Sequence, residues 1–516
     1  MEPSSYLTTF QQYLQRQGLA VSDELMEKIT VTLDQTQWDD PHTPLDFNNV
    51  AVMALIEAET SVDMAMREMY LDMAIAALNE GAEHPLCAAH LALVQSLIGE
   101  REDAIQSAFS TLLGVLLPAW ADAEIPAGLA FLPTRWRSCL NLPYAQLETI
   151  LDLRNGYQQS VLLAGEILCQ SQFVFYNAAG LRFLQLATQL FPASSLLNFR
   201  LGIASMMNAQ WEGLLYLHRA QRQQPHHPTM LQALFLAYQH LGQVEIARYW
   251  HHKAALEPIS ALWANLAPES PFTYMPFGQS LQMAVEASLQ SIVTGVLLAQ
   301  GTWFEQEMEF WQDHLQPGMT AIDVGANVGV YTFSAAQKVG PAGRVLAIEP
   351  FSTCVQCLLE TRRVNHLEWV TVCRGAASDR EGTAYLSLHS ASELNQLVAS
   401  PTAASTSVEE VPCFTLDALV EREQLTRVDI LKIDAEGHEL MVLQGSDRLL
   451  SQFAPVILYE NIAGSQGSNR PVADYLIAQG YQLFRYQPFI KQLYPLELTD
   501  NFDSSLNIIA IPRPKP

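Results

Sequence analysis

Residues 323–329 are Asp323-Val-Gly-Ala-Asn-Val-Gly329, a glycine-containing turn between two apolar stretches. The first stretch, Thr320–Val324, is short and continuous, which predicts a buried strand, and the second, Val328–Val339, predicts a helix. Gly325 allows the backbone a positive φ and a close approach to a ligand, and the start of the helix offers unpaired N–H groups. The stretch therefore predicts a strand, a tight turn and a helix that bind a ligand together.

A carboxylate follows at the end of the next predicted strand, Arg344–Glu349, 24 residues after Gly325. At an offset of about 20 residues, an acidic side chain accepts ribose hydroxyls in nucleoside-binding βαβ units. The turn has the spacing G-x-x-x-G, not the G-x-G-x-x-G of dinucleotide sites, and it lacks the Gly-Lys-Ser/Thr ending of a phosphate loop. Asp323 would repel a pyrophosphate but attract an ammonium group. The spacing therefore favours S-adenosylmethionine over NAD or ATP.

Length and composition indicate a globular chain with more than one domain. It has 516 residues, 49% of them apolar and 16% charged, which is enough for several cores. The formal net charge of −26 opposes binding to nucleic acid or anionic lipid. The N-terminus has no signal-peptide pattern, and prolines and acidic residues interrupt the most apolar stretch, residues 112–132. We therefore expect a cytoplasmic protein with no membrane span and no nucleic-acid partner.

The cysteines and histidines form no metal-binding pattern. The seven cysteines are scattered, which predicts reduced, buried thiols. Cys354 and Cys357 form a C-x-x-C within a predicted helix, without the second pair that zinc requires. The adjacent histidines His251 and His252 lie on a predicted helix, where they diverge by about 100° and cannot face one ion. We expect no metal at these residues.

The first half of the chain is helical by pattern and contains a repeat. Pro192, Pro225 and Pro258 are 33 residues apart. The clearest unit has small and aromatic residues at Tyr238, Gly242, Ala247, Ala254 and Pro258, which match a helix–turn–helix repeat of about 34 residues. Small residues let two helices approach, glycine ends the first helix and proline stops the second. These units resemble tetratricopeptide (TPR) repeats, and the alternative is a set of unrelated helical hairpins.

Three segments follow from these patterns: a helical N-terminal segment (1–60), a TPR-like repeat domain (61–262) and a domain of alternating strands and helices (270–516). Further strands are predicted at Val370–Ser378, Val428–Asp434, Pro455–Glu460, Tyr481–Tyr486 and Leu506–Ile511, with a hairpin arm at Thr383–Leu388 and a polar loop at 399–407. The alternation predicts a doubly wound α/β sheet, which binds ligands at the carboxyl ends of its strands.

Five motifs occur in order along the second half: Gly318-Met-Thr-Ala-Ile-Asp-Val-Gly-Ala-Asn-Val-Gly329, Glu349-Pro350, Ala376-Ala-Ser-Asp379, Thr415-Leu-Asp417 and Leu431-Lys-Ile-Asp-Ala-Glu-Gly437. Together they resemble the FkbM-type S-adenosylmethionine-dependent methyltransferases over about residues 275–512. The first motif alone indicates a class I methyltransferase, and the tandem of Asp434 and Glu436 is the specific feature. The resemblance implies a Rossmann-like class I methyltransferase sheet and methylation of hydroxyl groups on sugars or secondary metabolites.

The expected cofactor-binding residues are Asp323, Gly325, Asn327, Gly329, Glu349, Ser378 and Asp379. Asp323 and the turn would hold the amino-acid end of S-adenosylmethionine, and the Asn327 amide can donate and accept in the same turn. Glu349 would accept the ribose hydroxyls. The resemblance places Ser378 and Asp379 near the adenine, whereas the alternative for Asp379 is a turn-capping residue.

Asp434 and Glu436 are the expected catalytic residues, because a hydroxyl acceptor loses its proton as it attacks a methyl group. Asp434 ends a predicted strand and Glu436 follows it, at the edge where the acceptor should lie. The alternative makes them capping carboxylates of a helix that begins near Gly437. Glu460, at the end of the next strand, would complete a carboxylate set if the site held a divalent ion, although the predicted site contains no metal.

Two functions from different classes remain. The first is an S-adenosylmethionine-dependent O-methyltransferase that acts on a small-molecule or glycan acceptor and recruits a protein partner or carrier through its repeats. The second is a catalytically inactive methyltransferase-fold scaffold that acts through the TPR-like repeats. The complete set of motif residues favours the first, and the missing third glycine disfavours an NAD-dependent oxidoreductase.

Overall fold

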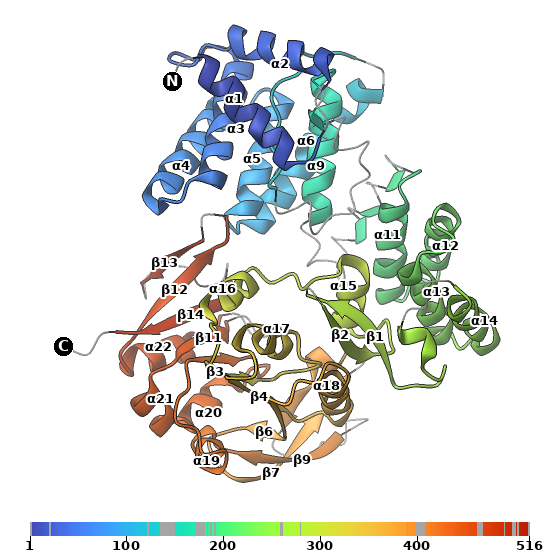
Figure 1. Ribbon diagram of the computed structural model, residues 1–516, viewed down its shortest axis with the longest axis vertical. Coiled ribbons are helices and arrows are strands. Elements are labelled where there is room, and N and C mark those ends of the chain that lie inside the picture. The colour runs from blue at the N-terminus through green and yellow to red at the C-terminus, as the bar shows by residue number, and fades with distance from the viewer. Residues whose placement is uncertain are drawn as a thin grey trace. The chain divides into compact units, whose positions relative to one another are not determined.

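The computed structural model describes most of the chain between residues 3 and 513 (Figure 1). It leaves out 1–2, 20–21, 121–122, 135–149, 152, 171–180, 183, 186–187, 190–191, 258–261, 279, 390, 399–407, 462–467, 490, 498–501, 503–504 and 514–516. The predicted polar loop at 399–407 and the repeat residue Pro258 therefore lie outside the described residues. The contacts divide the chain into two compact units: unit 1 is Met1–Leu201 with Gln487–Gln492, and unit 2 is Gly202–Tyr486 with Leu493–Pro516.

Unit 1 is built from helices. They are α1 (Pro3–Arg16), α2 (Asp23–Gln35), α3 (Pro44–Thr60), α4 (Met64–Glu80), α5 (Pro85–Leu97), α6 (Arg101–Trp120) and α9 (Gly156–Gln170), and α11 (Ser195–Met207) crosses into unit 2. Consecutive helices pack as pairs, α1 with α2, α3 with α4 and α5 with α6. Gly99 takes a φ of +92° after α5, and Ala104 of α6 is fully buried. Between α6 and α9 in sequence, residues 123–133 have no regular secondary structure.

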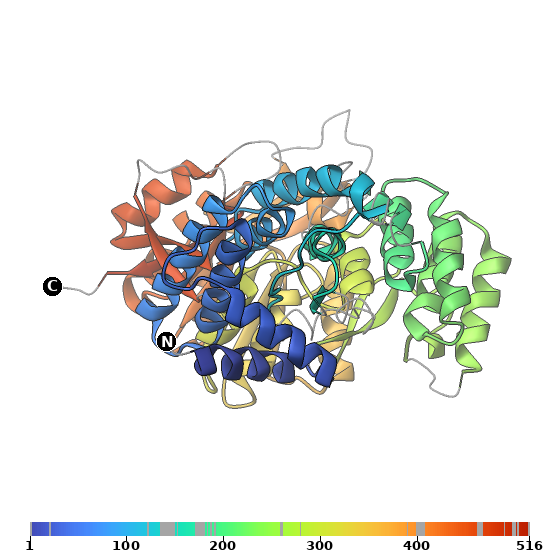
Figure 2. The ribbon, with the colours of Figure 1, turned by 90° about the horizontal axis from the view of Figure 1, so that it is seen from above.

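Three more helices follow in unit 2: α12 (Gly213–Gln223), α13 (Pro228–His240) and α14 (Val244–Ala255), which pack in sequence order (Figure 2). Gly242 takes a φ of +69° after α13, and Ala247 and Ala254 are buried on α14. This is the helix–turn–helix that the small-residue spacing predicts, and membership of the TPR class stays a prediction. The compact units divide within α11, whereas the predicted boundary at 262–270 marks the place where helices give way to strands.

The main sheet of unit 2 has the strand order β13-β12-β14-β11-β10-β3-β4-β5. Its strands are β3 (Thr320–Val324), β4 (Arg344–Glu349), β5 (Val370–Arg374), β10 (Ile430–Ile433), β11 (Val456–Glu460), β12 (Tyr481–Gln487), β13 (Gln492–Leu496) and β14 (Asn507–Pro512). The five strands from β11 to β5 are parallel, and β14 is antiparallel to both its neighbours, β11 and β12. This order, with one antiparallel strand inserted near the edge, confirms the predicted doubly wound class I methyltransferase sheet.

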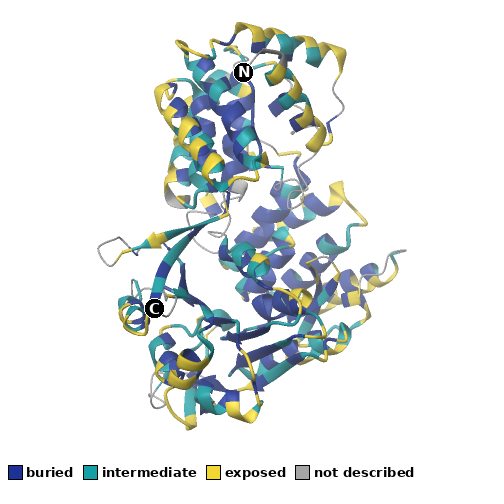
Figure 3. Cartoon of the chain, turned by 60° about the vertical axis from the view of Figure 1, so that its left-hand side comes forward, coloured by how far each residue is buried: buried dark blue, intermediate teal, exposed yellow. Residues whose placement is uncertain are grey.

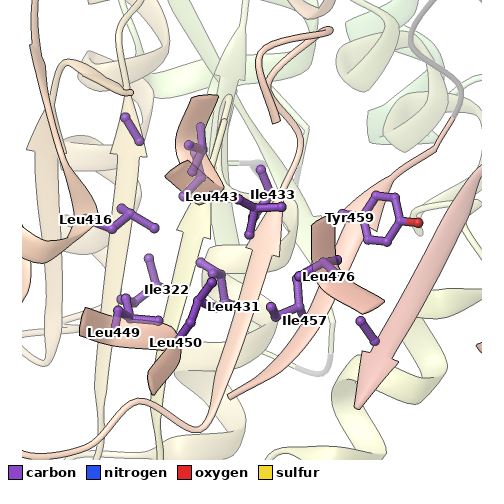
Figure 4. Close-up of a cluster of buried hydrophobic side chains, with 14 of the residues drawn as sticks. Ile322, Leu416, Leu431, Ile433, Leu443, Leu449, Leu450, Ile457, Tyr459 and Leu476 are labelled. Carbon is purple, nitrogen blue, oxygen red and sulfur yellow. The ribbon is translucent and has the colours of Figure 1, made fainter. Parts of the chain in front are cut away.

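Helices cover both faces of this sheet. On one face, α19 (Leu416–Arg422), α20 (Glu439–Gln444), α21 (Asp447–Phe453) and α22 (Arg470–Ala478) enclose an apolar core with Ile322, Leu431 and Ile457 (Figure 4). On the other face, α17 (Val330–Val339) packs on β3 and β4, and α18 (Ser352–Val364) packs on β4 and β5. Alternate residues of a strand point to opposite faces, so Asp323 and Lys432 point away from this core. Figure 3 shows the strands mostly buried and the outer helix faces exposed.

One predicted strand is wrong. Val370–Ser378 forms two short strands in different sheets, because Gly375, at a φ of +139°, turns the chain out of the main sheet. The second of them, β6 (Ala376–Ala377), joins β9 (Val408–Phe414), β7 (Gly382–Ser387) and β8 (Gln396–Val398) in a four-stranded sheet. A hairpin of β1 (Phe272–Phe277) and β2 (Leu281–Glu286) precedes the main sheet and was not predicted.

The remaining elements of unit 2 are the short helix η2 (Leu262–Asn265), α15 (Ile292–Gln300), α16 (Glu307–His314) and η3 (Ser392–Leu394). Five cysteines are free and buried: Cys87, Cys354, Cys357, Cys373 and Cys413. Among the described residues, none of the helices is both long and apolar enough to cross a membrane.

Candidate cofactor and acceptor site

Asp323 lies at the centre of the site with one carboxylate oxygen free. The residue is 1% exposed, and its Oδ2 accepts a hydrogen bond from Thr332 Oγ1 at 2.6 Å. Its Oδ1 is buried without a partner among the described residues. Burial raises the pKa of Asp323, and the Lys432 ammonium group opposes that rise. An unpaired, buried carboxylate oxygen is costly, so this atom is suited to a cationic ligand group.

The glycine turn passes directly over the carboxyl end of β10. Gly325 takes a φ of +74°, and a Cβ atom there would lie 1.6 Å from the main-chain oxygen of Asp434. Gly329 has a φ of +102°, and a Cβ there would meet Phe333 and Leu358. Both glycines are therefore required by contacts within the protein, in addition to any approach to a ligand. Asn327 also takes a positive φ, of 48°.

Glu349 connects the turn to the end of β4. Its Oε2 accepts the Asn327 N–H at 2.8 Å, and its Oε1 accepts the Phe351 N–H at 2.7 Å. Burial raises the pKa of Glu349 to about 7, although both hydrogen bonds oppose the rise. Each carboxylate oxygen has a second acceptor site. Glu349 can therefore hold the turn in place and still accept ribose hydroxyls.

Asp434 directly follows β10 and lies beside the turn, with its side chain partly exposed. Its Oδ2 accepts a hydrogen bond from Lys432 Nζ at 2.7 Å, and its side chain is 29% exposed. The Lys432 side chain is 3% exposed and its ammonium group lies 4.5 Å from the centre of the Tyr331 ring. Burial lowers the pKa of Lys432, but the neighbouring carboxylates outweigh burial and raise it overall. Asp434 is therefore held as the anionic partner of a buried cation.

The helix-capping role expected as an alternative for Asp434 and Glu436 is not found at α20, which has no side-chain cap hydrogen bond; a third carboxylate holds the loop before it. Glu439, which is fully buried, accepts the N–H groups of Ala435 and Gly437 at 2.9 and 3.1 Å. Its other oxygen accepts from Asn469 Nδ2 at 2.8 Å. The helix α20 starts at Glu439 itself. The carboxylates of Asp434 and Glu436 therefore remain available to contact an acceptor molecule or take its proton.

Three carboxylates converge at this edge: oxygens of Asp434, Glu436 and Glu460 lie within 4.8 Å of one another. Burial and the neighbouring negative charges raise the pKa values of Glu436 and Glu460. The Oε2 atom of Glu460 is buried without a partner among the described residues. The cluster can hold one or more protons near neutral pH, and its oxygen ligands are of the kind that a hard divalent cation takes.

Ser378 and Asp379 lie on the side of the site that faces α20. Ser378 Oγ is 3.0 Å from His438 Nε2 and 3.1 Å from Asp379 Oδ1. A Cβ at Gly445, after α20, would lie 2.0 Å from the main-chain oxygen of Ser378. These contacts fix Ser378 within the fold, and a place beside the adenine stays a prediction for both residues.

Two further elements of the site have no clear signal in the sequence. Tyr331, in the first turn of α17, donates a hydrogen bond from its hydroxyl to Glu305, which also accepts from Asn507 Nδ2 at 3.1 Å. The short helix η3 covers the turn, because Ser392 Oγ is 3.3 Å from Asn327 Nδ2 and donates to Glu286. Only the fold brings these residues to the site, since they come from segments far apart in the chain.

Comparison with known proteins identifies this region. Residues 323–483 match the sequence model of the Methyltransferase FkbM domain. These residues form an FkbM methyltransferase domain. A curated relative, a protein-L-isoaspartate O-methyltransferase of Triticum aestivum, is 50% identical over 42 residues, which are 8% of this chain and 18% of the relative.

Similar solved structures include the methyltransferase FkbM of Methylobacillus flagellatus (16% identity, TM-score 0.27, 44% of this chain and 54% of that one). Another is an O-methyltransferase of Bacillus cereus in complex with S-adenosylhomocysteine (16% identity, TM-score 0.25, 40% and 80%). A third is Aeropyrum pernix fibrillarin with bound S-adenosylmethionine (14%, 0.23, 38% and 68%). The chain spans about half of the FkbM structure and a small part of the curated relative. At these identities and TM-scores the likeness identifies no activity for this chain.

The cofactor of the FkbM methyltransferase domain is S-adenosylmethionine, and the residues of the site fit that molecule. The free Oδ1 atom of Asp323 is suited to its ammonium group. Glu349 has acceptor capacity left for its ribose. The positive φ values of Gly325 and Asn327 turn the backbone into the tight loop that such a ligand needs beside a helix N-terminus.

Proposed function

We propose that the chain is an S-adenosylmethionine-dependent O-methyltransferase that acts on a hydroxyl group of a small molecule or glycan. One observation carries the proposal: the cofactor turn and the carboxylate cluster share one edge of the sheet. Gly325 lies against the main-chain oxygen of Asp434, and Asp323 lies opposite Lys432 in the register of β3 and β10. A methyl donor held by the turn would therefore lie next to Asp434.

When bound, the cofactor supplies a methyl group on a positively charged sulfur, and an attacking oxygen displaces that sulfur in line. The chain's own residues align the acceptor and manage its proton. Asp434 takes the proton that the hydroxyl group loses, and the Lys432 ammonium group holds the carboxylate in position. Glu436 and Glu460 have oxygens within 4.8 Å of Asp434 and hold protons of their own.

Charge supports a particular class of acceptor. Oxygens of Asp434, Glu436 and Glu460 lie close together, and Lys432 is already paired with Asp434. Protonated Glu436 and Glu460 can donate and accept hydrogen bonds, whereas a phosphate or carboxylate group would find no unpaired cation among these four residues. We therefore infer a neutral, hydroxyl-rich or cationic acceptor, and we assign to the helical units the recruitment of a protein partner or carrier.

Calorimetric titration with S-adenosylmethionine, S-adenosylhomocysteine and NAD tests the proposal. We expect micromolar binding of the first two and none of NAD. The substitutions Asp323→Ala and Glu349→Ala should each weaken binding at least about tenfold while the far-ultraviolet circular dichroism stays unchanged. A folded chain that binds none of the three would be the methyltransferase-fold scaffold. Turnover that EDTA abolishes and Mg²⁺ restores would assign the three carboxylates to a cation instead of a proton.

A further inference from the structure

The interior of unit 1 encloses an extended segment of its own chain. Residues 123–133, between α6 and α9 in sequence, have no regular secondary structure. Leu129, Ala130, Phe131 and Leu132 are nevertheless at most 2% exposed. A buried extended segment cannot satisfy its own N–H and C=O groups, and each unsatisfied group is costly. Its main-chain groups must therefore find hydrogen-bond partners elsewhere in unit 1.

Side-chain amides bind the main chain of the segment at Gly128 and Leu129. Gln159 accepts the Gly128 N–H at 3.2 Å and donates to the Gly128 carbonyl at 3.0 Å. Asn49 Oδ1 accepts the Leu129 N–H at 2.9 Å, and Asn48 Nδ2 donates to the Leu129 carbonyl at 2.8 Å. Both polar groups of two consecutive residues are thus bound by side chains.

The same arrangement continues along the segment. Phe131 N–H donates to His90 Nε2 at 3.0 Å. The Tyr13 hydroxyl accepts the Leu132 N–H at 2.7 Å and lies 3.1 Å from the Leu132 carbonyl, which also accepts from Gln17 Nε2 at 2.7 Å. Each bond reaches a main-chain atom, so this part of the contact is independent of the side chains that the segment carries.

The binding side chains come from α1 and the turn that follows it, and from α3, α5 and α9; these helices include the first of each of the pairs α1–α2, α3–α4 and α5–α6 (Figure 1). They are Tyr13, Gln17, Asn48, Asn49, His90 and Gln159, and all are at most 2% exposed. Helices that only pack on one another bury apolar residues at such positions. Here six buried polar side chains bind one extended main chain instead, an arrangement that is typical of a peptide-binding site.

We propose that the inner face of unit 1 is a site for an extended peptide, and that residues 125–132 are a built-in occupant that a segment of a partner protein replaces. The partner segment is extended and uncharged and has the pattern Gly-Leu-x-Phe-Leu. Glycine is required because a Cβ at Gly128 would lie 2.7 Å from Asn48 Nδ2 and from Leu45. An aromatic residue is required where the Phe131 ring packs 5.6 Å from the Tyr13 ring.

This inference is independent of methyl transfer, and its test uses peptide binding to the full chain. The built-in occupant is weakened by Gly128→Val, which leaves all six binding side chains unchanged. The probe is a fluorescent peptide with the sequence of residues 123–134. Its anisotropy should show saturable binding at least about tenfold tighter to the variant than to the unsubstituted chain, because the tethered occupant competes at high effective concentration.

Two matched controls define the site. A peptide with valine at the position of Gly128 should not bind, and Asn49→Leu in the Gly128→Val background should abolish binding of the original peptide. A folded Gly128→Val chain that does not bind the peptide would overturn the proposal. Binding accompanied by dimerisation through exchanged segments would replace the partner protein with a second copy of this chain.

Hydrogen exchange of the unsubstituted chain keeps the proposal testable if Gly128→Val does not fold. A replaceable occupant opens locally, so the amides of Leu129, Phe131 and Leu132 should exchange at least about tenfold faster than the buried amides of α3 and α5. Exchange of all these amides at one common rate would make the segment an integral part of the core and refute the inference.

Discussion

The Nζ atom of Lys432 lies 2.7 Å from Oδ2 of Asp434, and only 3% of the Lys432 side chain is exposed. A lysine buried to this extent is stable only with partners, and here these are Asp434 and the face of the Tyr331 ring. Burial raises the pKa values of Asp323, Glu436 and Glu460, and the same ammonium group opposes each rise. Lys432 therefore links the cofactor side of the site to the carboxylate cluster.

Replacing Lys432 with methionine should move the acid limb of the pH–rate profile to higher pH. Without the cation, the carboxylates of the site hold their protons more tightly, because the interaction that favours their charged forms is lost. We expect a shift of about one pH unit, from the energy of one close charge in a partly buried site. Lys432→Arg is the matched control and should keep the limb within about half of that shift. A lower maximal rate with an acid limb at the same pH would show that Lys432 has a purely structural role.

Substitutions at Asp434 and Glu439 should affect different properties: the first should lower turnover, and the second should lower stability. Asp434→Asn removes the proposed base, so turnover should fall by about 10²- to 10⁴-fold, with cofactor affinity unchanged within about twofold. Glu439→Gln should instead lower the melting temperature, because Glu439 accepts two loop N–H groups and is fully buried. Steady-state kinetics, calorimetry and thermal unfolding check both variants. Loss of cofactor affinity in Asp434→Asn would move this residue into the cofactor site.

The apolar runs allowed most of the main sheet to be predicted from the sequence. The strands β3, β4 and β11 begin and end within one residue of their predictions, because each is a continuous apolar run between turn residues. The β1–β2 hairpin was missed, since Pro276 and the mixed polarity of its strands disguise it. The strand switch at Gly375 depends on a pairing with β9, which lies far along the chain.

Within the site, the residue types were predictable and their division of roles was not. The sequence places Asp434, Glu436 and Glu439 within six residues, and each can cap a helix or take a proton. Only the fold shows that Glu439 turns toward the N–H groups of its own loop while Asp434 meets Lys432. Likewise, residues 123–133 were visible as an apolar stretch broken by Pro126, but their partners lie on helices distant in sequence.

Cofactor affinity should depend on pH through Glu349. Burial raises the pKa of Glu349 to about 7, and the protonated group has lost an acceptor oxygen for the ribose. Affinity should therefore fall as the pH drops below about 7, by up to about tenfold per unit. The stability of the domain should depend on pH in the opposite direction to cofactor affinity. The folded domain binds this proton more tightly than the unfolded chain, so the contribution of Glu349 to stability decreases as pH rises from 4.5 to about 7.

Titration calorimetry between pH 5.5 and pH 8, about a unit or more either side of the Glu349 pKa, measures this dependence. Glu349→Gln is the matched control, because its amide does not titrate: its affinity should be lower and flat over the same range. Parallel pH profiles for the two proteins would assign the dependence to another group.

Gly325 should tolerate alanine far less than a glycine whose surroundings are open. Both Gly325 and Gly301 have a φ near +74°, but a Cβ at Gly301 meets nothing within 4 Å, whereas one at Gly325 lies 1.6 Å from the Asp434 oxygen. Gly301→Ala should cost about 1 kcal/mol for its left-handed backbone. Gly325→Ala should cost at least about 3 kcal/mol, as overpacking of a rigid backbone contact does, and it should abolish cofactor binding. Equal melting temperatures for the two variants would show that the turn and β10 separate easily.

Acid should loosen unit 1 through His90. Burial lowers the pKa of His90 to about 3, and its neutral ring accepts the Phe131 N–H while its other nitrogen contacts Asn48 Oδ1 at 2.9 Å. Below the ordinary pKa of 6.5 the unfolded chain binds a proton that the folded chain does not, so stability falls as the pH falls. The loss should reach about 2 kcal/mol at pH 5.

His90→Gln supplies the control, because its amide oxygen can accept the same N–H without titrating. The acid-dependent loss of unit 1 stability that His90 causes between pH 7 and pH 5, about the window in which the unfolded histidine gains its proton, should be absent from this variant. Hydrogen exchange of the α5 amides follows unit 1 separately from the rest of the chain. Exchange in the unsubstituted protein should accelerate toward pH 5 beyond the intrinsic rate, and that acceleration should be absent from His90→Gln. Equal acceleration in both proteins would show that another group senses the acid and that His90 serves only to bind the Phe131 main chain.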